Sequence, residues 1–230
     1  MLTKNIPVIT VDGPSGTGKG TISHLIADHL KWNVLDSGAL YRVLAYAAVT
    51  KSIDLKDIDA LVRLALDLNI HFELDETLHS RVFLEHIDIQ KPIREETCGQ
   101  NASTIAAIPE IRSALLERQR MFAKPPGLVT DGRDMGTVVF PNAVLKIFLY
   151  ASPEERARRR YTQLKDAGIH VSLPHVVEEL TKRDERDSSR QVAPLKAATD
   201  AVYIDTTGLS IQQVFSQVIS LIHERNIVAG

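Results

Sequence analysis

Apolar residues along the chain follow two spacings, one typical of buried strands and one of amphipathic helices. Short apolar runs predict five buried strands, at about 6–11, 33–35, 128–131, 145–149 and 201–205. Between them, apolar residues recur every three to four positions, which predicts helices over stretches that include 19–29, 40–48 and 211–222. Strands that alternate with helices predict an α/β fold, in which a parallel five-stranded sheet carries helices on both faces.

One region departs from this pattern. Residues 70–74 and 81–85 alternate apolar and polar side chains and are separated by a polar turn, which predicts a small antiparallel sheet. Such a sheet does not belong in a parallel core, so we interpret it as an insertion. Two helices are predicted after it, at about 96–105 and 109–123, with Pro109 in the first turn of the second.

A glycine-rich stretch joins the first strand to the first helix and predicts a phosphate-binding loop. Closely spaced glycines let successive backbone N–H groups point inward, and the helix that follows adds the positive end of its dipole. Lysine at its end supplies a mobile charge for the β- and γ-phosphates. The predicted ATP-binding residues are Gly13, Pro14, Ser15, Gly16, Thr17, Gly18, Lys19, Gly20 and Thr21. Gly20 occupies the position where such loops usually carry the hydroxyl that binds Mg²⁺.

Composition narrows the class of protein. The chain has 230 residues, a formal net charge of −2 and a single cysteine, Cys98. The near-zero charge gives no general attraction to nucleic acid or anionic membrane, and one cysteine excludes an internal disulfide. No apolar run approaches the roughly 20 residues needed to span a bilayer. We therefore expect a cytoplasmic protein that folds alone, and the eight histidines show no metal-ligand spacing.

Polar clusters follow directly on the predicted strands, at Asp12, Asp36–Ser37 and Asp131–Asp134. Ligands of open parallel sheets bind beyond the carboxyl ends of the strands, so these clusters indicate the site.

Four segments in this order resemble the motif set of the bacterial cytidylate kinases: Gly13–Thr21, Asp36–Arg42, Asp131–Thr137 and Arg183–Arg190. The resemblance runs nearly end to end. It implies a single P-loop kinase domain of P-loop NTPase type, with a nucleoside-monophosphate-binding insertion at about 37–105 and a short helical lid at about 154–172. It also implies phosphoryl transfer from ATP to CMP or dCMP with Mg²⁺ as cofactor. We expect a monomer whose partners are these nucleotides, with neither nucleic acid nor membrane.

Transfer between two phosphates needs charge and positioning and no base, because the acceptor is already an anion. Arginine forks suit phosphate oxygens, and the chain has arginines in each of the three recognised segments that follow the glycine-rich loop. The predicted catalytic residues are Lys19, Arg133, Arg156 and Arg160. From the resemblance, and for Asp134 from its capacity to accept from the cytosine amino group, the predicted CMP-binding residues are Ser37, Tyr41, Arg42, Ser103, Arg112, Arg133, Asp134, Arg183, Asp187 and Arg190.

Several alternatives stay open on sequence grounds. The arginines at 156–160 also fit a solvated basic helix, and Arg183 with Asp187 fits a surface ion pair. Asp131 suits either Mg²⁺, held through water, or the orientation of Lys19 or Arg133, so the metal ligands stay unnamed. A GTPase would use residues 181–184 to read its base, although they fall inside a helical pattern. A kinase acting on a hydroxyl would use Asp36 as base, and a non-catalytic nucleotide-binding module is the third alternative.

Overall fold

The computed structural model describes residues 6–74, 80–166 and 168–228. The chain divides into two compact units, each described here by itself. The first comprises Met1–Leu35 and Ala123–Gly230, and the second is the continuous segment Asp36–Phe122. The predicted insertion at about 37–105 falls within the second unit and stays a prediction.

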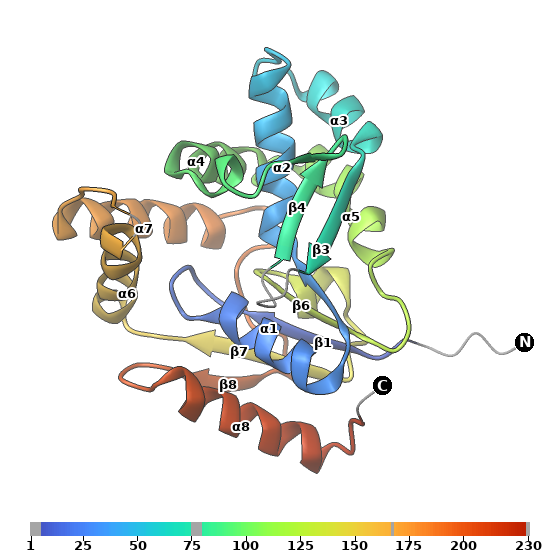
Figure 1. The fold of residues 1–230 in the computed structure, drawn as a ribbon, viewed down its shortest axis with the longest axis vertical. Helices are drawn as coiled ribbons and strands as arrows, with labels where there is room; N and C mark the ends of the chain where they lie inside the picture. The colour runs from blue at the N-terminus through green and yellow to red at the C-terminus, as the bar shows by residue number, and fades with distance from the viewer. Residues whose placement is uncertain (1–5, 75–79, 167, 229–230) are drawn as a thin grey trace, which may run out of the picture. The chain divides into compact units, whose positions relative to one another are not determined.

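The first unit is built on the predicted five-stranded sheet, which is confirmed (Figure 1). Its strands are β1 (Val8–Asp12), β2 (Asn33–Asp36), β6 (Leu128–Gly132), β7 (Leu145–Tyr150) and β8 (Val202–Asp205). The spatial order is β2-β6-β1-β7-β8, and β1 pairs in parallel with both β6 and β7. The strand that precedes the glycine-rich loop is therefore central, and the Asp131 segment ends the strand beside it.

Alternation along the central strand separates two environments. Ile9 and Val11 face an apolar core that also contains side chains of α1 (Lys19–Leu30), α8 (Ile211–Glu224) and the single tryptophan, Trp32. Thr10 and Asp12 point to the opposite face, where the π-turn η2 (Met135–Val139) lies. One face thus supplies stability, while the other holds polar groups at the carboxyl end of β1.

Two further helices of the first unit, α6 (Pro153–Asp166) and α7 (Leu173–Ser188), pack side by side (Figure 1). They share a small apolar cluster of Ala157, Leu164, Val176 and Leu180. Residues 181–184 lie inside α7, as the helical pattern predicted. Arg190 lies beyond this helix, because α7 ends at Ser188 and Ser189 is its C-cap.

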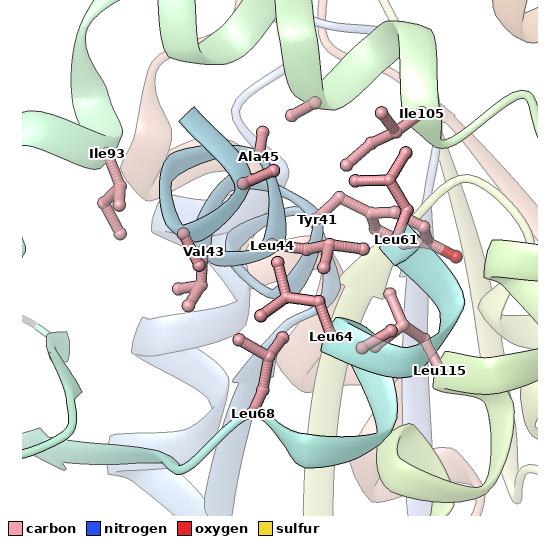
Figure 2. Close-up of a cluster of buried hydrophobic side chains, with 14 of the residues drawn as sticks. Tyr41, Val43, Leu44, Ala45, Leu61, Leu64, Leu68, Ile93, Ile105 and Leu115 are labelled. Atoms are coloured by element: carbon pink, nitrogen blue, oxygen red, sulfur yellow. The ribbon is translucent and has the colours of Figure 1, made fainter. Parts of the chain in front are cut away.

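The second unit has its own apolar core, formed around α2 (Ser37–Thr50) by α3 (Ile58–Asp67), α4 (Glu96–Ile105) and α5 (Pro109–Arg120). Figure 2 shows Leu44, Leu61 and Leu115 converging in this core. The predicted antiparallel sheet is confirmed, with β3 (Ile70–Leu74) paired to β4 (Ser80–Leu84). A short third strand β5 (Ile87–Asp88) and the turn η1 (Pro92–Arg94) follow, whereas the predicted polar turn at 75–79 lies outside the described residues.

Of the helices that the structure describes, none combines the length and apolar character that crossing a membrane requires.

Candidate active site

The glycine-rich loop wraps the end of β1 in a conformation that requires glycine. Gly13 has φ +146°, and a Cβ there would lie 2.1 Å from the carbonyl oxygen of Leu149 on β7. Gly16 has φ +82°, and its Cβ would lie 3.0 Å from Cβ of Arg156 on α6. Both glycines therefore let the loop approach neighbouring backbone more closely than any other residue could.

Lys19 begins α1 and folds back over this loop. Its Nζ donates a hydrogen bond of 2.7 Å to the carbonyl oxygen of Pro14, and the residue is buried. Burial first, and then the charges of Arg133 and Arg183, lower the pKa of Lys19 to about 7, while Asp131 and Asp12 act in the opposite direction. The ammonium thus lies at the loop in surroundings that disfavour its charge until an anion arrives.

Asp12 anchors the polar face of the sheet. Its two carboxylate oxygens accept from the backbone N–H groups of Met135 (2.9 Å) and Gly136 (2.8 Å). Burial raises the pKa of Asp12 to about 6, against these hydrogen bonds, which lower it. The carbonyl oxygen of the buried Asp134 in turn accepts from the backbone N–H groups of Val138 and Val139.

Asp187 lies among three of the five arginines that the sequence analysis assigned to CMP. Arg133 Nε donates to its Oδ2 at 2.7 Å, and Arg190 forms an ion pair with its Oδ1. Burial of Asp187 would raise its pKa, but Arg133, Arg190 and Arg183 together hold that pKa below its usual range. The structure therefore brings Arg133, Arg183, Asp187 and Arg190 together around one carboxylate, and the interpretation of Asp187 as part of a solvated surface pair is wrong.

The arginines of α6 have unequal surroundings. Arg156 is buried and donates to the carbonyl oxygens of Ala151 and Ser15 and to Oδ2 of Asp184. Arg159 donates to Glu155, to Thr206 and, at 3.4 Å, to the carbonyl of Thr17. Arg158 is exposed beside Glu155, and Arg160 is half-buried. The first half of α6 is thus bound to the outside of the glycine-rich loop.

A cavity of about 280 Å³ opens beside the loop within the first unit. Its walls come from the loop and α1, from α6, and from the segment after β8; they include Gly16, Thr21, Arg159, Thr206, Leu209 and Val214. The size and mixed lining suit a nucleoside portion of a ligand whose phosphates follow the loop.

The second unit carries the other residues assigned to CMP. Ser37, Tyr41 and Arg42 lie on α2, Ser103 on α4 and Arg112 on α5. The guanidinium of Arg112 lies 5.7 Å from the ring centroid of Tyr41 and donates to the carbonyl of Ala106. Arg42 donates to the carbonyl of Ile93 and passes so close to Gly99 that a Cβ there would lie 2.9 Å from its Nη1.

Cys98 is buried on α4, its thiol donating to the carbonyl of Arg42, and burial raises its pKa. Both observations indicate a packing role for Cys98, because a reactive thiol needs a lowered pKa and exposure.

Two residues of the loop's surroundings were not predicted as site residues. Asp184 pairs with Arg156, and the Thr206 hydroxyl bridges the carbonyls of Thr17 and Tyr150. These contacts join residues 28 and 189 positions apart, so no local spacing could indicate them.

Metal-binding capacity in the described ranges rests on single carboxylates. Within residues 6–74, 80–166 and 168–228, no three His, Cys, Asp or Glu side chains form a group that could hold an ion. Mg²⁺ commonly needs only one or two carboxylates when a substrate's phosphates supply further oxygens. Asp131, the last but one residue of β6, whose charge acts on Lys19, fits that requirement.

Comparison with known proteins gives a consistent result. The family model described as cytidylate kinase matches residues 9–224. A cytidylate kinase of Azotobacter vinelandii is 54% identical over 96% of both chains, and one of Nitrosococcus oceani is 55% identical over 98% of this chain and 100% of its own. A crystal structure of an uncharacterized protein from Eubacterium ventriosum has a TM-score of 0.53 at 12% identity, covering 96% of this chain and 99% of that one, which concerns the fold alone.

Proposed function

The chain belongs to the cytidylate kinase family, and from this membership we propose that it transfers the γ-phosphoryl group of ATP to CMP and dCMP, giving ADP and CDP or dCDP. The observation that carries the proposal is the arginine cluster around Asp187. Its member Arg133 directly follows β6, the strand that neighbours β1, and the glycine-rich loop directly follows β1. A loop that cradles a polyphosphate beside preassembled guanidinium groups suits transfer between two phosphates, which is driven by charge and position.

We assign the donor to the loop residues Gly13 to Thr21 and its nucleoside to the cavity between α1, α6 and the segment after β8. Lys19 exchanges its hydrogen bond to Pro14 for hydrogen bonds to the β- and γ-phosphates. Its ammonium stabilises the negative charge that shifts between the phosphates during transfer. Arg133 and Arg160 neutralise the transferring group. A direct contact of Arg156 with phosphate remains a prediction, because this guanidinium already donates to Ala151, Ser15 and Asp184.

Mg²⁺ is the divalent cation we propose, with the phosphates of ATP as its main ligands and Asp131 as the protein's contribution. When bound, the ion neutralises charge on the β- and γ-phosphates. Gly20 at the usual hydroxyl position is consistent with a metal held mainly by substrate.

For the acceptor, we propose that Arg183 and Asp187 bind the ribose, that Arg190 binds the phosphate, and that Ser37, Tyr41 and Arg42 also bind CMP. Arg112, Ser103 and Asp134 read the base. Cytosine donates from N4 and accepts at N3, so a carboxylate and a guanidinium match it, while uracil presents the opposite polarity.

A cytoplasmic location also remains a prediction and rests on the lone cysteine.

An ADP-release assay with CMP, dCMP, UMP, AMP and shikimate as acceptors tests the proposal. We expect ADP with CMP and dCMP and much less with the others. ADP release with shikimate alone would support a hydroxyl-directed kinase with Asp36 as base. Against that rival, Asp36 already accepts from the N–H of Ala39 as the N-cap of α2.

A further inference from the structure

Arg156 connects three segments of the first unit through one guanidinium group. Nη1 donates to the Ser15 carbonyl oxygen at 3.2 Å and to Oδ2 of Asp184 at 2.5 Å, while Nε donates to the Ala151 carbonyl oxygen at 3.2 Å. The side chain is only 7% exposed, so little solvent competes for these contacts. The glycine-rich loop, the start of α6 and the helix α7 are thus held by the same group.

Asp184 is the part of this arrangement that reaches the acceptor residues. It lies on α7, one position after Arg183 and three before Asp187, and its charge also acts on Arg133. Its other oxygen, Oδ1, is buried and has no hydrogen-bond partner within the part of the chain that the structure describes. The orientation of this carboxylate therefore depends on the contact with Arg156.

The loop is held at its outer side. Arg156 donates a hydrogen bond to the carbonyl oxygen of Ser15. Arg159 and the hydroxyl of Thr206 both donate to the carbonyl oxygen of Thr17. Because these carbonyls point outward to donors, the intervening N–H groups are left to face the ligand. A phosphate that orders the loop also orders Arg156, and with it Asp184 and α7.

We propose that Arg156 and Asp184 are a positioning pair that couples the binding of ATP to the binding of CMP. The proposal rests on the proposed function, because it concerns the same two substrates. A first ligand that orders the shared contact relieves the second of that entropic cost, so each substrate tightens the binding of the other by the same factor. Arg156 acts here through the loop and through Asp184.

The coupling is measured by titration calorimetry of CMP without and with a saturating non-hydrolysable ATP analogue, and of the analogue without and with CMP. For the unmodified protein we expect CMP to bind about fivefold or more tightly in the presence of the analogue, with the same factor in the reverse experiment. In Asp184→Asn, which keeps shape and one acceptor oxygen, the factor should fall below about twofold.

Two further variants frame this result. Arg156→Lys keeps the charge, but a single ammonium lacks the fork that spans Ser15, Ala151 and Asp184, so its factor should fall as well. Glu185→Gln makes the same chemical change at the next, exposed position of α7 and should keep the unmodified factor. Trp32 fluorescence checks that each variant is folded.

A pair that only stabilises the fold would weaken each substrate equally with and without the other, leaving the coupling factor unchanged. An unchanged factor in Asp184→Asn and Arg156→Lys therefore overturns the proposal, as does a factor of one in the unmodified protein. Failure of the proposed function is a separate result, because the unmodified protein would then release no ADP with CMP.

Discussion

Replacing Asp187 with alanine removes the carboxylate on which the arginine cluster depends. Asp187 is almost fully buried and binds Arg133 through one oxygen and Arg190 through the other, while the charge of Arg183 also acts on it. Removing one partner of a buried ion pair leaves an uncompensated charge and costs about 3–5 kcal/mol. For a protein of this size each kcal/mol corresponds to about 2–4 °C, so Tm should fall by about 6–20 °C.

The single tryptophan gives a local readout of this loss. Trp32 is buried in the core of the unit that contains Asp187, so its fluorescence during thermal or urea unfolding reports on that unit. Glu178→Ala is the matched control, because Glu178 pairs with Lys182 on the same helix and both side chains are more than half exposed. An exposed pair of this kind contributes about 0–1 kcal/mol, so the control should change Tm little.

The pH dependence sharpens the test. The pKa of Asp187 lies below its ordinary value of 3.8, so its stabilisation is complete above about pH 4 and is lost as pH falls through the folded-state pKa. The difference between the unmodified protein and Asp187→Ala should be constant from about pH 5 to 8 and shrink below about pH 4. A loss no larger than that of Glu178→Ala at pH 7 would refute the reasoning, since the arginines would then need no buried counter-charge.

Three further predictions concern the loop and the base. Lys19→Met should fold but lose more than about nine-tenths of kcat with CMP. Bound polyphosphate should raise the pKa of Lys19 from about 7, so the unmodified protein should take up protons when it binds an ATP analogue near pH 8. Calorimetry in two buffers measures this proton uptake, which should be absent in the variant. Asp134→Ala should lower kcat/KM for CMP by roughly 10- to 200-fold and for UMP much less; equal losses would move base recognition elsewhere. Gly13→Ala should destabilise the protein, because its Cβ meets the backbone of Leu149, whereas Gly20→Ala, with open space around it, should leave Tm unchanged or slightly raised; equal Tm values would contradict the close approach.

The sheet could be predicted because each strand is a short apolar run. Every residue of β1 and β6 is buried, as expected for strands in the interior of a sheet that is covered on both faces. The helical pair after the insertion was predicted for a local reason too, since Pro109 starts α5. The π-turn at Met135–Val139 could not be predicted. Its apolar, β-branched residues favour a strand, and the turn forms because Asp12, more than 120 positions earlier, accepts the N–H groups at its start.

The candidate site shows the same division. The motifs identify Lys19 and the arginines, because residue type and order are visible in the sequence. The partner of each arginine is not visible, since four arginines on one short helix have different surroundings and only Arg156 is buried among backbone acceptors. Local spacing predicts which charges exist, whereas tertiary packing decides which of them are bound to protein.

The two units have separate apolar cores: one contains only residues of Asp36–Phe122, and the other only residues outside that segment. Substitutions that alter the volume of Leu61 or Leu115 are therefore compensated by neighbours within the same segment, without repacking around Ile9 and Val11. Over evolutionary time, such independence lets the segment Asp36–Phe122 diverge while the glycine-rich loop and its sheet stay under their own constraints. Protein engineers could use the same property by exchanging the whole segment between homologues.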